Sequence, residues 1–169
     1  MLKRLSDTRC MDTSLKLQLD RYIPALINFF SNKMSNGASQ LYAFLFDMGV
    51  TDWRILSLLA VEENIPASRI CHIIGLDKSA VSRSLAKLQE RGYIKMTVDK
   101  KDSRVKKNTL TSAGLIMYEK MYQVAKEREE KILEVLSDED QEHLIRILNI
   151  LNCEINDINE FFIEKYIQK

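Results

Sequence analysis

The chain has 169 residues, 46% of them hydrophobic and 29% charged, which is the composition of an ordinary folded domain. At this length we expect one domain that buries roughly two-thirds of its unfolded surface. No run of about 18 apolar residues occurs, which argues against a membrane-spanning helix. The start of the chain, Met1–Asp7, lacks the apolar core of a secretory signal. The three cysteines, Cys10, Cys71 and Cys153, are odd in number and far apart, so we expect reduced thiols in the cytosol.

The charge is unevenly distributed along the chain. The net charge of +1 taken over the whole chain says nothing about nucleic acid. Between Asp77 and Lys107, however, ten basic and four acidic residues give a net charge of +6, which leaves −5 for the rest. A basic module on a mildly acidic body is typical of a DNA-binding protein. A solvated basic face would have the same charge, so local structure has to decide.

The first predicted element is a long apolar helix. Its stripe starts at about Ser14 and recurs at spacings of three or four, with Leu15, Leu19, Tyr22, Leu26 and Phe30. Pro24 lies inside this pattern and should kink the helix or reset its start. Asn36-Gly37 would ordinarily predict a turn. The pattern therefore leaves open one long kinked helix or two, and Gly49 is expected to end it.

Two short helices follow. The near-continuous apolar run Trp53–Leu59 predicts a helix buried on most sides, with Thr51 as its N-cap. Pro66 suits the first position of the next helix, which Gly75 ends.

A third helix should start at Asp77, its N-cap, run to about Arg91 and close at Gly92. Its buried stripe is predicted to be Val81, Leu85 and Leu88. The residues left on its outer side are Ser79, Ser82, Arg83, Ala86, Lys87 and Glu90.

A β-hairpin is predicted next. Residues 93–98 alternate between apolar and polar, residues 105–110 do so more weakly, and the polar stretch 99–104 separates them. Thr111 is then expected to cap another helix, and Ser137 with Asp140 to open the last one.

The last helix has a sustained 3.5-residue repeat, which is typical of a helix–helix seam. Its members are Leu144, Leu148, Leu151, Ile155, Ile158 and Phe162. A helix packed within its own monomer would give the same repeat. Ile145, Ile147 and Ile150 add a second apolar face, however, which favours a partner chain.

Helix, glycine-containing turn, helix and hairpin is the order of a winged helix-turn-helix. Ser79, Ser82, Arg83 and Lys87 lie at i, i+3, i+4 and i+8, so they share one side of the predicted helix. Arg83 is suited to a bidentate contact with guanine. The two serines are short enough to reach phosphates or base edges, and Lys78 and Lys87 would neutralise phosphates. Lys100, Lys101 and Arg104 at the hairpin tip would reach the adjacent minor groove or the DNA backbone.

Three stretches carry a more specific pattern. They are Gly75–Arg83, Leu88-x-x-x-Gly92-Tyr93-Ile94, and Asp99-x-x-Asp102-x-Arg104 leading to Leu110-Thr111-x-x-Gly114. Together they resemble the multiple-antibiotic-resistance regulator (MarR) family of bacterial transcriptional regulators, over a match from about Leu15 to the end of the chain. The resemblance implies a mainly α fold with a small β-hairpin wing, a winged helix-turn-helix on a helical dimerisation base. The implied parts are residues 14–48 and 112–169 for the base, and 50–111 for the DNA-binding domain.

The resemblance also implies a homodimer that binds a pseudo-palindromic operator, most often as a repressor, and is released by a small molecule, with no cofactor. In the family the major groove is read from the helix that here holds Ser79, Ser82 and Arg83. The wing arginine, here Arg104, enters the minor groove while Asp102 orients it. On this interpretation Asn36-Gly37 lies within one long first helix.

A narrower resemblance suggests an effector. Leu19–Pro24 and Thr51–Leu56 are similar to the family branch that controls aromatic-acid catabolism, including hydroxycinnamate repressors. The family's effector pocket lies between the dimer base and the reading domain. Its expected lining here is Arg21, Tyr22, Asn28, Trp53, Arg54, Met117 and Met121. An arginine would pair a ligand carboxylate while aromatic and methionine side chains pack on its ring. Equally, these residues would serve as plain core and a structural ion pair.

Other classes of function fit less well. A redox sensor of the same fold would use Cys10, but no resolving partner is evident, and Cys71 and Cys153 fall in apolar settings typical of inert core thiols. His72 and His143 lack further ligands at metal spacing. No phosphate loop, nucleophile elbow or HExxH motif indicates an enzyme. A helical adaptor protein would use the last helix but would leave the basic segment unexplained.

Overall fold

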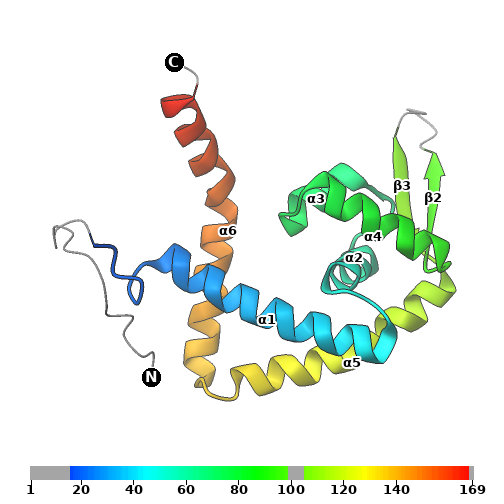
Figure 1. Cartoon of the computed structure of the whole chain (residues 1–169), viewed down its shortest axis with the longest axis horizontal. Helices are drawn as coiled ribbons and strands as arrows, with labels where there is room; N and C mark the ends of the chain where they lie inside the picture. The colour runs from blue at the N-terminus through cyan, green and yellow to red at the C-terminus, as the bar shows by residue number, and fades with distance from the viewer. Residues whose placement is uncertain (1–15, 99–104, 168–169) are drawn as a thin grey trace. The chain divides into compact units, whose positions relative to one another are not determined.

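The computed structural model describes residues 16–98 and 105–167, and the chain divides into two compact units, residues 1–118 and 119–169. The described residues are mostly helical with one small sheet (Figure 1). The helices are α1 (Ile23–Phe46), α2 (Val50–Val61), α3 (Ala67–Ile74), α4 (Lys78–Glu90), α5 (Ser112–Leu133) and α6 (Asp138–Tyr166). The strands are β1 (Ile65–Pro66), β2 (Ile94–Val98) and β3 (Lys106–Leu110). Within these two ranges, no helix is long and apolar enough to cross a membrane.

Helix α1 is a single helix, and Asn36-Gly37 lies in its interior. The turn rule is therefore wrong at this pair, and the one-helix interpretation implied by the family resemblance is confirmed. A glycine inside a helix costs about 1 kcal/mol relative to alanine, which the packing of a 24-residue helix can outweigh.

The helix starts later than the apolar stripe predicted. Leu19 and Tyr22 precede α1, in a turn in which the Tyr22 N–H donates to the Gln18 carbonyl at 2.9 Å. Pro24 explains the shift, because it has no N–H to donate and its ring would clash with the carbonyl four residues earlier. It is instead tolerated in the first turn of the helix that begins at Ile23.

The junction between α1 and α2 also differs from prediction. Helix α1 ends at Asp47, which adopts the left-handed conformation with φ of 53° and donates its N–H to the Ala43 carbonyl at 3.0 Å. Gly49 does not end α1. It is the N-cap of α2, and its N–H donates to Oδ2 of Asp52 at 2.8 Å. Thr51 lies inside the first turn of α2, so both the predicted end and the predicted cap were wrong.

The sheet is three-stranded and antiparallel, in the order β1-β3-β2. Strands β2 and β3 form the predicted hairpin, with Ile94 opposite Leu110 and Val98 opposite Lys106. Strand β1 was not predicted. It has only two residues, of which Ile65 pairs with Asn108 of β3. Pro66 belongs to this edge strand and is the N-cap residue of α3. It therefore lies one position before the first helical position that the sequence predicted for it.

The core of the first unit lies where α2, α3 and α4 meet the sheet. Its buried apolar side chains are Ile55, Leu56, Leu59, Ile65, Ile70, Val81, Leu85, Leu88 and Ile94. This includes the whole predicted stripe of α4. Ser84 is buried as well, which the apolar pattern did not indicate.

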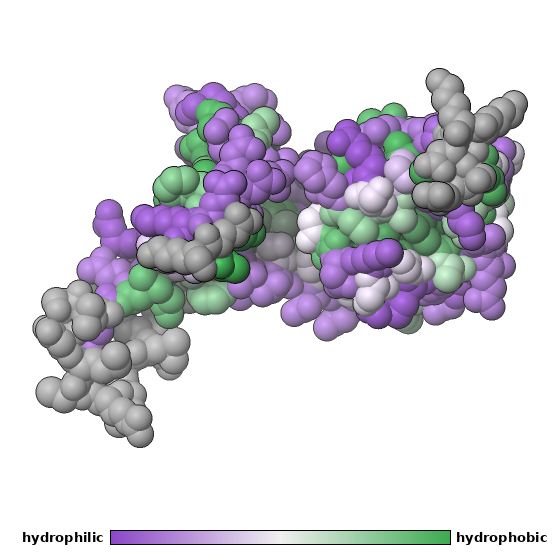
Figure 2. All heavy atoms as spheres, turned by 90° about the horizontal axis from the view of Figure 1, so that it is seen from above, coloured by the Kyte–Doolittle hydropathy of each residue, from purple (hydrophilic) through white to green (hydrophobic). Residues whose placement is uncertain are grey.

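The second unit contains most of α5 and all of α6. Ser137 caps α6 as predicted, accepting a hydrogen bond from the Asp140 N–H at 3.1 Å. No α6 residue is buried, and the six residues of its 3.5-residue seam are 37–49% exposed. Hydrophobic side chains accordingly reach the surface in Figure 2, where they are green. Cys153 is exposed too, which corrects the prediction of a core thiol. It lies two positions after Leu151, so it points roughly 200° around the helix from the seam.

The start of α5 packs directly on the turn after α4. Thr111 caps α5, accepting the Gly114 N–H at 3.0 Å, and its own N–H donates to the Tyr93 carbonyl at 3.0 Å. A Cβ added to Gly114 would lie 1.9 Å from that Tyr93 oxygen. Only glycine therefore permits this close approach between the first turn of α5 and Tyr93, the residue before β2.

We predict that Gly114→Ala destabilises the protein by about 2 kcal/mol, because the methyl group must displace backbone. In an open helix the same change would stabilise by about 1 kcal/mol, so the sign is diagnostic. Urea unfolding measures the difference. Ser112→Ala, an exposed position on the same turn, is the matched control and should lie within about 0.5 kcal/mol of wild type. A stabilised Gly114→Ala protein would contradict the packing described.

Candidate nucleic-acid interface

Asp77 fixes the start of α4 as predicted. Its Oδ1 accepts hydrogen bonds from the N–H groups of Ser79 at 2.8 Å and Ala80 at 2.9 Å. These bonds, that from Ala80 foremost, hold the pKa of the Asp77 carboxyl below its ordinary value. The cap satisfies two of the N–H groups that would otherwise be unpaired at the helix N-terminus.

The outward face of α4 contains four of the predicted contact residues. Lys78, Ser79, Ser82 and Arg83 are all exposed. Nη1 of Arg83 donates to Oγ of Ser79 at 2.8 Å, one turn earlier on the helix. A guanidinium has five N–H donors, so this bond orients Arg83 while using only one of them. The face thus presents an oriented arginine, two hydroxyl groups and a lysine, which can hydrogen-bond to base edges and phosphates.

Lys87 does not share this outward arrangement. It is half-buried, and its ammonium lies 3.2 Å from Oδ2 of Asp52 and 2.9 Å from the main-chain oxygen of Asp47. The sequence prediction of a phosphate contact treated Lys87 as a solvated side chain. The structure gives its charge two intramolecular partners instead.

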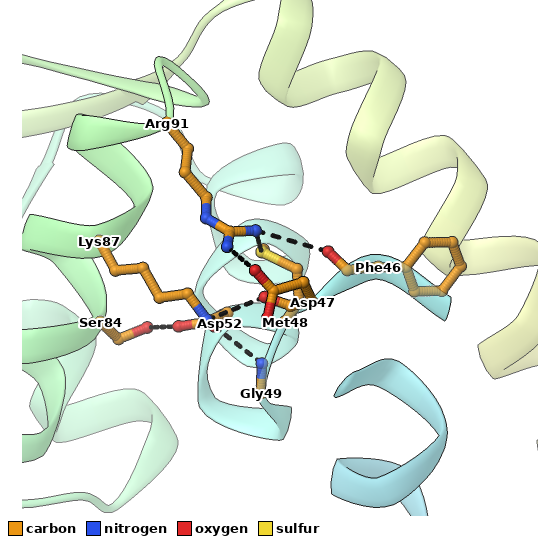
Figure 3. Close-up of polar contacts among 8 residues, drawn as sticks. All are labelled: Phe46, Asp47, Met48, Gly49, Asp52, Ser84, Lys87 and Arg91. Carbon is orange, nitrogen blue, oxygen red and sulfur yellow. Dashed lines mark hydrogen bonds and ion pairs between the residues drawn. The ribbon is translucent and has the colours of Figure 1, made fainter. Parts of the chain in front are cut away.

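Sequence reasoning missed the polar network to which Lys87 belongs (Figure 3). Ser84 donates a hydrogen bond to Oδ1 of Asp52, and Arg91 forms an ion pair with Asp47. The Arg91 guanidinium, by hydrogen bond and charge, lowers the pKa of the Asp47 carboxyl, and that carboxylate raises the pKa of Arg91. A serine beside the buried stripe and an aspartate at the third position of α2 were the available signals.

The wing is only partly described. Lys95 on β2 and Lys106 on β3 are exposed. The predicted tip contacts Lys100, Lys101, Asp102 and Arg104 lie outside the described residues, as does Cys10.

Two predicted effector-pocket residues lie together on α2. Trp53 stacks on Tyr118 with ring centroids 5.7 Å apart and planes 7° from parallel, and its ring lies 6.1 Å from that of Tyr42. Nη2 of Arg54 donates to Oγ of Ser35 on α1 at 2.9 Å. Trp53 and the half-buried Arg54 are consecutive on α2, so the aromatic stack and the guanidinium leave the helix about 100° apart.

The other predicted pocket residues are placed less favourably. Arg21 and Tyr22 are exposed in the turn before α1. Asn28 is exposed on α1 and accepts a hydrogen bond from Asn32 at 3.3 Å. Met117 is half-buried, and Met121, which belongs to the second unit, is fully buried and offers no surface to a ligand in this conformation. Among the described residues no three His, Cys, Asp or Glu side chains cluster as metal ligands would.

Comparison with known proteins supports the interpretation of this region. Residues 46–105, from the end of α1 to the wing, match the MarR family. The chain is 34% identical to a MarR/EmrR family transcriptional regulator from Acinetobacter sp. ADP1, whose crystal structure superposes with a TM-score of 0.77. That match covers 83% of this chain and 99% of the other.

Two further relatives are more distant. The S. aureus MepR–DNA complex has a TM-score of 0.70 at 23% identity, covering 79% of this chain and 98% of that one, which shows a shared fold. The chain is also 26% identical over 93 residues to the HTH-type transcriptional regulator PapX of Escherichia coli. This stretch is 54% of this chain and spans only 56% of PapX.

We predict that Asp77→Ala lowers the midpoint of thermal unfolding at pH 7, because two N–H groups of α4 lose their acceptor. Asp77→Asn, the matched control, keeps a side-chain oxygen as acceptor, so its midpoint of thermal unfolding should fall much less. Folding lowers the pKa of this carboxyl. The stability that the Asp77 carboxylate contributes is therefore fully present above the ordinary pKa of about 3.9, and it is lost as the pH falls through the lowered pKa of the folded protein. The deficit of Asp77→Ala should therefore shrink on acidification below about pH 4. A deficit independent of pH, or equal in both variants, would be inconsistent with this role.

Proposed function

Because this chain belongs to the MarR family of transcriptional regulators, we propose that it binds double-stranded DNA as a homodimer, represses transcription from a pseudo-palindromic operator, and is released by a small aromatic acid. The observation that carries the DNA-binding part is the outward face of α4. It is capped at its N-terminus, it follows a helix and a tight turn, and it presents an oriented arginine beside two hydroxyl groups.

The proposed contacts divide by chemistry. Arg83 reads a guanine through O6 and N7, since a bidentate arginine is the commonest specific base contact. Ser79 and Ser82 allow α4 to lie deep in the major groove, and Lys78 neutralises a phosphate. In the wing, Lys100, Lys101 and Arg104 contact the flanking backbone or minor groove, with Asp102 orienting Arg104. MepR, which has the same fold, was crystallised with DNA, and this supports the proposal of DNA binding.

The proposed homodimer is supported by the surface of α6. A helix whose seam residues are all more than one-third exposed leaves a continuous apolar face in contact with water. A second copy of the chain would bury that face. Two copies related by twofold symmetry would place their α4 helices in successive major grooves, about 34 Å apart.

The proposed effector is an aromatic carboxylate such as a hydroxycinnamate. The Trp53–Tyr118 stack provides flat apolar surface, and the neighbouring Arg54 would pair a carboxylate by exchanging its bond to Ser35. Such a ligand releases DNA only to the extent that it binds the free form more tightly than the bound form.

We predict that the protein binds its own upstream DNA more tightly than a scrambled control, with an affinity that falls steeply as salt rises. Arg83→Ala should reduce the free energy of operator binding by about 1–3 kcal/mol and relax the sequence preference. Lys78→Ala should weaken binding to all sequences alike and reduce the salt slope by about one. Fluorescence titration across a salt series measures both. No binding to either fragment at low salt would contradict DNA binding, and an unchanged Arg83→Ala protein would contradict the contact assignment.

We predict that 4-hydroxycinnamate changes the fluorescence of Trp53, the single tryptophan of the chain, and lowers operator affinity. Arg54→Ala should lower the affinity for the ligand by about tenfold or more, as expected for the loss of a charged hydrogen bond. Ser35→Ala is the matched control, because it removes the intramolecular bond while keeping the guanidinium. Equal losses in the two variants, or no effect of the ligand on wild type, would reject this effector site.

A further inference from the structure

Three side chains of α4 contact one short stretch of chain, the junction between α1 and α2. They are Ser84, Lys87 and Arg91, spaced at i, i+3 and i+7, so they lie along one side of the helix and its C-cap. Their partners all fall within residues 46–52. The spacing is that of a helix anchored along its length (Figure 3).

Asp52 is the centre of this anchor. Its side chain is 6% exposed, and both of its oxygens are used. Oδ1 accepts from Ser84, while Oδ2 accepts the Gly49 N–H at 2.8 Å and lies 3.2 Å from the Lys87 ammonium. A carboxylate buried to this degree is tolerated only when its charge and lone pairs are satisfied. Removing either α4 partner would therefore leave a buried group incompletely paired.

Lys87 joins both helices of the junction at once. Besides Asp52 of α2, its ammonium donates to the main-chain oxygen of Asp47, the left-handed residue that ends α1. Arg91 adds a second tether to the same place, through the Asp47 carboxylate, the Phe46 carbonyl at 3.5 Å and the Met48 sulfur at 3.8 Å. The orientation of α4 is thus set by the last residues of α1 and the first turn of α2.

Ser84 lies on a different side of α4 from the proposed reading residues: at about 100° per residue, Ser82 lies roughly 160° around the helix from it, and Arg83 roughly 100°. Lys87 lies only about 40° from Arg83 by the same count, but its contacts with Asp52 and Asp47 direct its ammonium to the α1–α2 junction. The network therefore leaves the outward face uncovered while fixing the direction in which it points. It also holds the charge of Lys87 away from that face.

We propose that Asp52 and Lys87 are positioning residues for DNA binding. They lock α4 to the α1–α2 junction, so that operator affinity depends on Lys87 although its ammonium does not neutralise a phosphate. This inference rests on the proposed function. It makes the C-terminal end of α1 the place from which a change in the helical part of the chain reaches the reading helix.

Salt dependence separates positioning from phosphate contact. Lys87→Met keeps most of the apolar stem and removes the charge. It should weaken operator binding roughly tenfold, the size expected for a coupled network, with the slope of log affinity against log salt unchanged. Lys78→Ala, the matched control on the outward face, should lower that slope by about one. A slope lowered equally in both variants would overturn the inference.

A double-mutant cycle with Asp52→Asn provides the second test. If Lys87 acts through Asp52, the double variant should bind operator about as well as the worse single variant. If Lys87 contacts phosphate directly, Asp52→Asn would free the Lys87 ammonium to bind DNA. The effects of the two substitutions on operator affinity would then be additive or of opposite sign. Should Asp52→Asn not fold, the cycle of Ser84→Ala with Lys87→Met replaces it, because both side chains bind the same carboxylate.

A measurement without DNA distinguishes the two proposals. The same cycle, followed by urea unfolding, should show coupling between Asp52 and Lys87 in the free protein. Additive effects on unfolding would overturn the inference while wild-type operator binding stands. Absence of operator binding by wild type would overturn the proposed function, and with it the role of the network in DNA binding.

Discussion

The buried carboxylate of Asp52 is the interaction on which the arrangement of the first unit depends. It caps α2 through the Gly49 N–H and meets α4 through Ser84 and Lys87. One side chain therefore fixes where α2 starts and where α4 lies. A buried charge is costly unless every partner is in place, so the geometry around it is specified more sharply than an apolar contact would specify it. The apolar core of α2, α3 and α4 stabilises the fold, whereas this network sets the orientation of α4 relative to α1 and α2.

Helix α4 is also held at both of its ends by local contacts. The Asp77 cap sets its first turn, and Gly92, with φ of 71°, ends it and starts the hairpin. Gly114 then allows α5 to approach the Tyr93 carbonyl closely. Helix α4 is thus fixed at its start, along its inner side and at its end, while its outward face stays exposed. A helix that reads DNA, as we propose for α4, needs this combination of a fixed backbone position and an exposed outward face.

Most of the features that the sequence predicted correctly have causes within a few residues, although the local rules failed at Asn36-Gly37 and at Gly49, whose N–H is bound by Asp52 three residues later. The Asp77 and Ser137 caps, the Gly92 stop and the β2–β3 hairpin all follow from neighbouring residues, and all are present. Features caused by distant residues were missed. The bonds of Asp52 to Ser84 and of Arg91 to Asp47 join positions 32 and 44 residues apart, and no periodicity encodes them. The same holds for β1, a two-residue strand that exists only because β3 lies beside it. The wing tip and the effector site remain predictions.

On the proposed function, two copies of α4, each held by this network, read one pseudo-palindromic operator. Hydroxyl-radical footprinting of the full-length protein on its own upstream DNA tests this most directly. We expect two protected half-sites whose centres are about one helical turn, roughly 10 base pairs, apart, with flanking protection where the wings reach the backbone. A single protected half-site, or uniform protection without sequence preference, would contradict it.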